Sequence, residues 1–335
     1  MLQVWVEFII CLVLIAAASR TVAKYGDLIA DRTGLGGVWV GVALLAVVTS
    51  LPELFTGLGA IAFVKSPDLA IGELFGSCAF NLMIVALLDL AYRNGPLLGQ
   101  LKGQGHLRSA TMGMVLIAVA VLGALISTMF HIRIGWIGIE TFVIILLYAI
   151  MFRSILKHES SQPAETDKSK SEGTTTAPLT KAYLLFGIGA LVVAGAGIWL
   201  AFVGKDIANA TGLEESFVGT LIIAFTTSFP EVTVSYSALR IGALDMSIAN
   251  MAGSNMFNIL IVGILDIAYG QAPILSAASS IHMVTGLMVL LMTGVFIGGI
   301  LRPHRSWTRY QLSWYALPLL IIYLITMYIN FNVGS

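Results

Sequence analysis

The sequence predicts an all-α membrane protein in which ten transmembrane helices form two inverted five-helix repeats. Three observations lead to this prediction. Apolar residues make up 58% of the chain and charged residues 11%, and the mean hydropathy is +0.92. The apolar residues fall into ten long segments, and the two halves of the chain share a long internal repeat. A soluble domain rarely carries so little charge, so we expect the lipid bilayer to surround this chain.

Each apolar segment is close to the length of about 20 residues that a helix needs to cross a bilayer. The ten predicted helices cover residues 2–24, 37–62, 68–90, 110–130, 135–153, 181–203, 215–240, 245–268, 280–301 and 311–331. The first five helices belong to a repeat at 1–157, and the last five to a repeat at 181–335. Segment 158–180 is polar and charged, which indicates a flexible cytoplasmic linker between the repeats.

The basic residues predict the orientation of the chain. All of the 18 Lys and Arg residues except Lys65, Arg133 and Lys205 lie in the loops on one side. Cytoplasmic loops carry the excess of Lys and Arg. We therefore expect both termini outside, in a protein of the plasma (inner) membrane. The net charge of zero argues against nucleic acid as a partner.

The internal repeat joins two blocks in each half. TGLGGVWVGVALLAVVTSLPEL at 33–54 matches TGLEESFVGTLIIAFTTSFPEV at 211–232, and a second match links 76–96 with 253–273. Each half has five predicted helices, an odd number, so equivalent helices cross the membrane in opposite directions. Secondary transporters with such inverted repeats place their sites in broken helices near the membrane midplane.

Two glutamates, Glu53 and Glu231, occupy equivalent positions inside apolar helices. A charge at the bilayer centre costs about 2.5–3.5 kcal/mol, so it requires a partner or a function. Neither half has a Lys or Arg at mid-helix depth, which makes a bound cation the natural compensating charge. Pro52 and Pro230 disturb the preceding turns, and we expect them to free carbonyls near Ala46 and Ala224.

Further oxygen donors surround the two glutamates in the sequence. They are Thr49, Ser50, Thr227 and Ser228 beside the prolines, and Ser77, Asn81, Ser254 and Asn258 in the next helices. A single Ser or Asn in a membrane helix is more often a contact between helices, and one buried Glu can be protonated and structural. Two glutamates in the same repeated context favour an ion site. Such oxygens, without His or Cys, suit hard cations such as Ca²⁺ or Na⁺.

Other acids have weaker claims to a site. Glu73 precedes Ser77 by four residues and shares its helix face, so it lies either in the ion pathway or at its mouth. The equivalent position in the second repeat is the neutral Asn250. We expect Asp89 and Asp266, near helix ends, to be solvated or to pack, and Glu140 to face water or a loop.

At these residues the chain resembles the calcium/cation antiporter superfamily, in particular its sodium/calcium exchanger branch. The blocks TSLPEL with GSCAFN, and TSFPEV with GSNMFN, are similar to the two alpha repeats of that family. The resemblance covers both repeats and the ten-helix plan. It implies that the glutamates, hydroxyls and amides named above, with main-chain oxygens at Ala46 and Ala224, line sites for Ca²⁺ and Na⁺. It also implies that helices 1 and 6 slide across the core to alternate access.

The chain departs from the family pattern at several positions. Val48 and Thr226 stand where the family commonly has Gly, Cys78 replaces the Asn of the first GSN triplet, and Glu73 replaces Asn or Thr. Both Asn81 and Asn258 are neutral, whereas some members have Asp at one of these positions. These differences bear on ion selectivity and stoichiometry more than on the fold.

The resemblance implies an antiporter that exchanges Na⁺ for Ca²⁺, acts as a monomer and needs no cofactor. Nearby alternatives are a proton/calcium exchanger and a potassium-dependent sodium/calcium exchanger, and a cation channel is an alternative from another class. A membrane enzyme is disfavoured because the sequence has no HExxH pair and no GxSxG elbow. His282 stands alone in its helix, and we expect it to be a packing residue.

Overall fold

The structure, a computed structural model, describes residues 1–33, 45–92, 94–101, 105–130, 132–159, 178–302 and 313–333. The elements of the first half are α1 (Leu2–Arg32), α3 (Leu51–Gly59), η1 (Ala60–Val64), α4 (Pro67–Ala91), η2 (Leu97–Gln100), α5 (Gly105–Phe130), β1 (Arg133–Ile134), β2 (Ile137–Gly138) and α6 (Ile139–Glu159). Those of the second half are α7 (Leu179–Thr211), α8 (Glu215–Phe217), η3 (Val218–Ile223), α9 (Ala224–Thr227), α10 (Phe229–Arg240), α11 (Leu244–Tyr269), α12 (Ile274–Ala277), α13 (Ile281–Leu301) and α14 (Ala316–Val333).

The prediction of a helical membrane protein is confirmed. Among the described residues, eight helices are long and apolar enough to cross a membrane, and the bent pair Glu215–Thr227 with Phe229–Arg240 makes a ninth. Each of the ten predicted segments overlaps a described helix, including α6 at the fifth. Residues 37–44 of the second predicted helix, and residues 160–177 of the predicted linker, lie outside the described residues.

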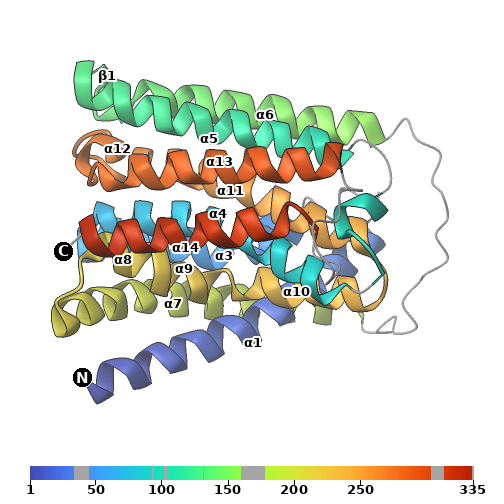
Figure 1. Ribbon diagram of the computed structural model, residues 1–335. Helices are drawn as coiled ribbons and strands as arrows, with labels where there is room; N and C mark the ends of the chain where they lie inside the picture. Colours follow the sequence, from blue (N-terminus) through green and yellow to red (C-terminus); the bar gives the residue numbers. More distant parts are fainter. Residues whose placement is uncertain are drawn as a thin grey trace.

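The helices run side by side in layers, as Figure 1 shows. The helices α5 and α6 lie at one side of the bundle, α1 and α7 lie at the other, and α4 and α11 lie between them. The central pair is the most enclosed, because 83% of the apolar window of α4 and of α11 is buried, against 28% for α1. The first and last described helices, α1 and α14, begin and end at the same end of the bundle (Figure 1). This agrees with an even number of crossings.

Two aspartates join the halves through matching contacts. Asp89 at the end of α4 accepts hydrogen bonds from the Leu97 amide (2.8 Å), the Ser313 hydroxyl (2.9 Å) and the Tyr315 hydroxyl, just before α14.

Asp266 at the end of α11 accepts hydrogen bonds from the amides of Ile274 (2.7 Å) and Gly138 (2.8 Å) and from the Thr141 hydroxyl (2.6 Å), at the start of α6. Each half therefore caps the last helix of the other half. Both aspartates are buried, so they pack rather than face water.

The short hairpin between α5 and α6 was not among the elements predicted from the sequence. Strands β1 and β2 pair antiparallel around a turn in which Gly135 has a φ of 65°. Positive φ costs little at glycine because it lacks a Cβ. The hairpin aims the Gly138 amide at Asp266, which fixes the start of α6.

Candidate functional site

Two membrane-spanning helices are broken at equivalent serines. In the first half, the helical residues 45–49 end at Ser50, which has φ −90° and ψ 13°, and α3 begins at the next residue. In the second half, α9 ends at Ser228, with φ −83° and ψ 5°, and the chain bends by 43° into α10. Pro52 and Pro230 lie in the first turn of the new segment. A proline is tolerated there because its missing N–H is not needed in a first turn.

The two glutamates lie at the amino ends of these new segments. Glu53 is in the first turn of α3 and Glu231 in the first turn of α10, and both are fully buried. A helix amino terminus carries a partial positive charge, which favours a carboxylate. The breaks therefore place both anionic groups where the backbone partly offsets the cost of burying them.

Each glutamate is bound by a serine from the opposite half. The Ser228 hydroxyl donates to Glu53 Oε1 at 3.1 Å, and the Ser50 hydroxyl donates to Glu231 Oε1 at 3.0 Å. The second oxygen of each carboxylate, Oε2, has no hydrogen-bond partner among the described residues. Since a buried carboxylate oxygen without a partner is costly, each Oε2 is available to a cation.

The remaining hydroxyls gather around the same carboxylates. Thr49 Oγ1 lies 3.5 Å from the Ser254 hydroxyl, and the equivalent pair of Ser77 and Thr227 has the same separation. Ser254 also donates to Glu231 Oε1 at 3.3 Å. The structure thus brings together the six predicted hydroxyls and both glutamates from the two broken helices and from α4 and α11.

The two amides differ in their contacts. Asn81 donates its amide group to Asn255 Oδ1 at 3.0 Å, while neither polar atom of Asn258 makes a hydrogen bond with the described residues. Sequence reasoning missed Asn255, which also donates to the Cys78 carbonyl at 3.2 Å. Its repeat mate is Cys78, so the repeat gave no signal for a polar role. Asn258 and the Asn81 carbonyl oxygen remain available to a ligand.

The prolines do not free the carbonyls of Ala46 and Ala224 themselves. Ala46 accepts from the Ser50 amide at 3.2 Å, and Ala224 accepts from the Ser228 amide at 3.0 Å. A proline removes the donor to the carbonyl four residues earlier, which is Val48 or Thr226 here. Each alanine carbonyl also accepts from the hydroxyl of a nearby threonine, from Thr49 at 3.2 Å for Ala46 and from Thr227 at 3.4 Å for Ala224. A role as ion ligand stays a prediction.

Close packing of helices without side chains between them builds the walls of the site. A Cβ at Gly76 of α4 would lie 2.3 Å from the Thr220 carbonyl oxygen in η3, and one at Gly253 of α11 would lie 2.8 Å from the Ala46 Cβ. Small residues allow such close contacts between membrane helices. The π-helical segment η3 directly precedes α9, and such segments are frequent at functional sites.

The acid Glu140 does not face water, but its carboxylate lies against the hairpin between α5 and α6, where a Cβ at Gly138 would lie 2.2 Å from Glu140 Oε1. Glu140 is 3% exposed, and its Oε1 accepts a hydrogen bond from the Ser127 hydroxyl of α5 at 3.0 Å. Gly123 leaves room for it, because a Cβ there would lie 2.4 Å from the Glu140 Cβ. Glu140 therefore packs between α5 and α6, away from the two broken helices.

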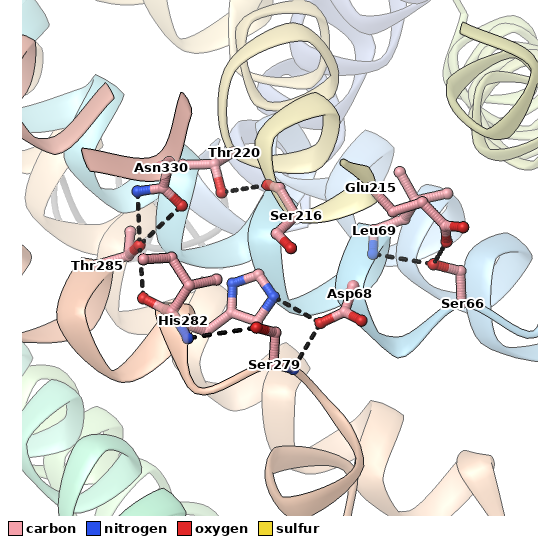
Figure 2. Close-up of polar contacts among 11 residues, drawn as sticks. Ser66, Asp68, Leu69, Glu215, Ser216, Thr220, Ser279, His282, Thr285 and Asn330 are labelled. Carbon is pink, nitrogen blue, oxygen red and sulfur yellow. Dashed lines mark hydrogen bonds and ion pairs between the residues drawn. The ribbon is translucent and has the colours of Figure 1, made fainter. Parts of the chain in front are cut away.

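His282 packs as expected, but it does not stand alone. Figure 2 shows its ring against Asp68 at the start of α4, at 3.0 Å, and Asp68 also accepts from the Ser279 amide at 2.6 Å. The matching contact in the other half is His106 with Asp245, at 2.7 Å. These pairs join α13 to α4 and α5 to α11, so they too cross between the halves.

A polar cluster beside His282 joins two neighbouring loops. Ser66 hydrogen-bonds to Glu215 and caps α4 through the Leu69 amide (Figure 2), and Lys205 at the end of α7 pairs with Glu215. This cluster lies at the helix ends, apart from the buried glutamates.

Comparisons with known proteins agree with this arrangement. Residues 3–154 and 181–332 each match the family described as sodium/calcium exchanger protein. The uncharacterized membrane protein MJ0091 of Methanocaldococcus jannaschii is 27% identical over 253 residues, 75% of this chain and 77% of that protein.

Two solved structures show the same fold. A structure of the sodium-calcium exchanger NCX_Mj aligns over 98% of both chains with a TM-score of 0.62 and 21% identity. The H⁺/Ca²⁺ exchanger CAX aligns over 99% of this chain and 85% of its own, with a TM-score of 0.74 and 14% identity. Since both identities are low, these likenesses concern the fold alone.

The two family matches, one in each half, cover nearly the whole chain. The protein is therefore a transporter rather than an enzyme, and it belongs to the sodium/calcium exchanger family of calcium/cation antiporters.

Proposed function

We propose that this protein exchanges Na⁺ for Ca²⁺ across the membrane by alternating access. One observation carries the proposal. In each of the buried carboxylates of Glu53 and Glu231, one oxygen accepts a hydrogen bond from a serine of the other half, and the second oxygen has no hydrogen-bond partner among the described residues. Two carboxylates balance the charge of one Ca²⁺. Carboxylate, hydroxyl and amide oxygens are the ligands that Ca²⁺ prefers.

The proposed ligand set contains both glutamates with the surrounding hydroxyls and amides. It comprises Glu53, Glu231, Thr49, Ser50, Ser77, Asn81, Thr227, Ser228, Ser254 and Asn258, with the Ala46 and Ala224 carbonyls. The six hydroxyls support Na⁺ rather than H⁺ as the driving ion, because a proton needs only the carboxylates while Na⁺ needs several neutral oxygens.

Alternating access would use the pair α1 and α7, the first helices of the two halves. They pack against each other along one side of the bundle (Figure 1). Small residues permit this packing, since a Cβ at Gly189 of α7 would lie 2.8 Å from Val22 Cγ2 of α1. We propose that these two helices slide as a unit over the core, within two halves at 1–157 and 181–335 joined by a cytoplasmic linker.

The orientation and setting are also part of the proposal. We place the chain in the plasma (inner) membrane as a monomer, with both termini outside, because the basic residues concentrate in the loops of the opposite side. Labelling of Gln3→Cys with an impermeant reagent in intact cells tests the orientation, and modification only after lysis would contradict it.

Ca²⁺ uptake into proteoliposomes tests the driving ion. Vesicles loaded with Na⁺, K⁺ or protons, one gradient at a time, are placed in a common Ca²⁺ medium. We expect uptake only with the outward Na⁺ gradient, and we expect no requirement for K⁺. The potassium-dependent exchangers that this chain resembles have an acid tied to K⁺ at the position of Asn258, which is neutral. Uptake that follows the proton gradient would contradict the proposal, and so would Na⁺-driven uptake that stops without K⁺. Single-channel currents in planar bilayers would instead indicate a channel.

A further inference from the structure

A third buried carboxylate lies next to the proposed site. Glu73 lies in α4, two turns after the helix begins and one turn before Ser77, and its side chain is 0% exposed. Neither of its carboxylate oxygens makes a hydrogen bond to any described residue. Membrane-buried acids face the interior of the bundle and mark ion paths. An acid buried with two unused oxygens is expected either to bind a cation or to be neutral.

The broken helix of the second half packs directly against this acid. A Cβ at Gly219 of η3 would lie 3.1 Å from the Glu73 amide nitrogen and 2.7 Å from the Leu69 carbonyl oxygen. This close approach brings α9 to the same turn of α4. Ser77, one turn further along α4, lies 3.5 Å from Thr227 Oγ1 of α9, and the Glu73 carboxylate is close enough to Glu53 of α3 to interact with its charge. Thr227 and Glu53 are both members of the proposed ligand set.

The equivalent position in the other half shows what a neutral side chain does there. Asn250 of α11 donates to the Ser235 hydroxyl at 3.2 Å, and its Oδ1 lies 3.5 Å from Thr49 Oγ1. The amide therefore has protein partners for both of its polar atoms. Glu73 lies on the turn of α4 that packs against the matching threonine, Thr227, but its oxygens lack such partners, and Gly57 stands where the other half has Ser235. The halves therefore differ in hydrogen bonding at this position.

We propose that Glu73 is a third anionic ligand that, with Thr227, forms an additional cation subsite beside Glu53. The subsite suits a hard monovalent cation, and Na⁺ is the one that the exchange supplies. This inference rests on the proposed function and adds a charge to it. With Ca²⁺ bound between Glu53 and Glu231, the core would keep one net negative charge, whereas a core with a neutral residue 73 would be neutral.

Ca²⁺/Ca²⁺ exchange without Na⁺ isolates that charge. Tracer Ca²⁺ uptake is measured in proteoliposomes with saturating Ca²⁺ on both sides and a membrane potential set by a thiocyanate gradient. One charge that crosses the full field changes the ratio of inward to outward translocation rates by about 50-fold per 100 mV, from about 2.3 kcal/mol. We therefore expect a voltage-dependent, bell-shaped rate for the wild type and for Glu73→Asp. The rates of Glu73→Gln and Glu73→Asn, which carry a neutral side chain, should be independent of voltage.

The matched control is Glu140→Gln, which removes another buried glutamate, away from the broken helices, and should keep the wild-type voltage profile. Identical voltage profiles for wild type and both neutral variants would overturn the inference and leave the Na⁺/Ca²⁺ exchange intact. Absence of Ca²⁺/Ca²⁺ exchange in the wild type would overturn the proposed function itself, and this inference with it.

A second measurement needs no transport. Na⁺ raises the melting temperature of a purified protein that binds it in the folded state. We expect the Na⁺ concentration for half of this effect to increase by about tenfold or more in Glu73→Gln, because a ligand with charge is lost. An unchanged Na⁺ concentration would contradict a subsite at Glu73.

Discussion

In the first half Glu53 accepts a hydrogen bond from Ser228, and in the second half Glu231 accepts one from Ser50. The same exchange occurs at the helix ends, where Asp89 and Asp266 each cap the last helix of the other half. The glutamates and the capping aspartates thus each have a repeated contact that crosses from one half to the other. The two halves therefore build one shared site rather than two independent ones.

Two of the differences between the halves lie close to that site. The position of Glu73 in the first half is equivalent to that of Asn250 in the second half, and the position of Cys78 is equivalent to that of Asn255. The first difference adds an acid to one side of the core, and the second adds an amide that bonds to Asn81. We therefore expect the contacts that occur in both halves to hold the cation between Glu53 and Glu231. We expect the residues that differ between the halves to determine which ions bind.

Neutralising either glutamate tests the symmetric part most severely. We expect Glu53→Gln and Glu231→Gln each to abolish Na⁺-driven Ca²⁺ uptake, because Ca²⁺ would lose half of its balancing charge. Expression and thermal stability should be retained, since the fold loses only a costly buried charge. Near wild-type uptake in both variants would show that the site has been assigned to the wrong residues, and Glu140→Gln is the control.

The two serines should have equal and smaller effects. Ser50→Ala and Ser228→Ala each remove a hydrogen bond to a carboxylate, worth about 1.5–3 kcal/mol. We expect the apparent Ca²⁺ affinity to fall by about 10–100-fold in each, measured from the Ca²⁺ dependence of uptake. A loss confined to one of the two variants would break the symmetry.

The two glycines of the core should differ, because their surroundings do. A Cβ at Gly76 would meet a backbone oxygen at 2.3 Å, whereas one at Gly253 would meet a methyl group at 2.8 Å. Overpacking costs about 1–3 kcal/mol, and we expect Gly76→Ala to show the larger cost. Thermal unfolding in detergent measures it, and a melting temperature lower in Gly253→Ala would contradict this order.

The capping aspartates give the smallest expected difference. All three contacts of Asp89 go to Oδ1, while those of Asp266 use both oxygens. Asparagine keeps one acceptor oxygen, so Asp89→Asn can keep its contacts and Asp266→Asn cannot. We expect Asp266→Asn to lower the free energy of unfolding by about 1–2 kcal/mol and Asp89→Asn by less, as measured by melting temperature. Equal losses would show that the two caps do not differ in this way.

Much of the fold and of the candidate site could be predicted from the sequence, because apolar segments and repeated motifs are local signals. The ten helices, the inverted repeat and the residues around Glu53 and Glu231 were read in this way. The partners of His282, Glu140, Asp89 and Asp266 were not, since they lie in other helices or loops. The role of Asn255 was also missed, because its repeat mate is a cysteine.

The breaks in the helices show the same limit. Pro52 and Pro230 predicted a disturbed turn, but not that Ser50 and Ser228 would leave the helix and bond to the opposite glutamate. The close contact of η3 with Gly76 depends equally on the packing of α4. Such features follow from the contact between the halves, which no single segment specifies.

A structure of the purified protein with Ca²⁺, located by its anomalous scattering, tests the central claim most directly. We expect one Ca²⁺ peak between the two broken helices, with oxygens of both Glu53 and Glu231 at about 2.3–2.6 Å. A crystal of the Glu53→Gln variant, grown with Ca²⁺ in the same way, should lack this peak. A Ca²⁺ ion bound by only one of the two glutamates, or bound elsewhere in the protein, would contradict a site shared by the two halves.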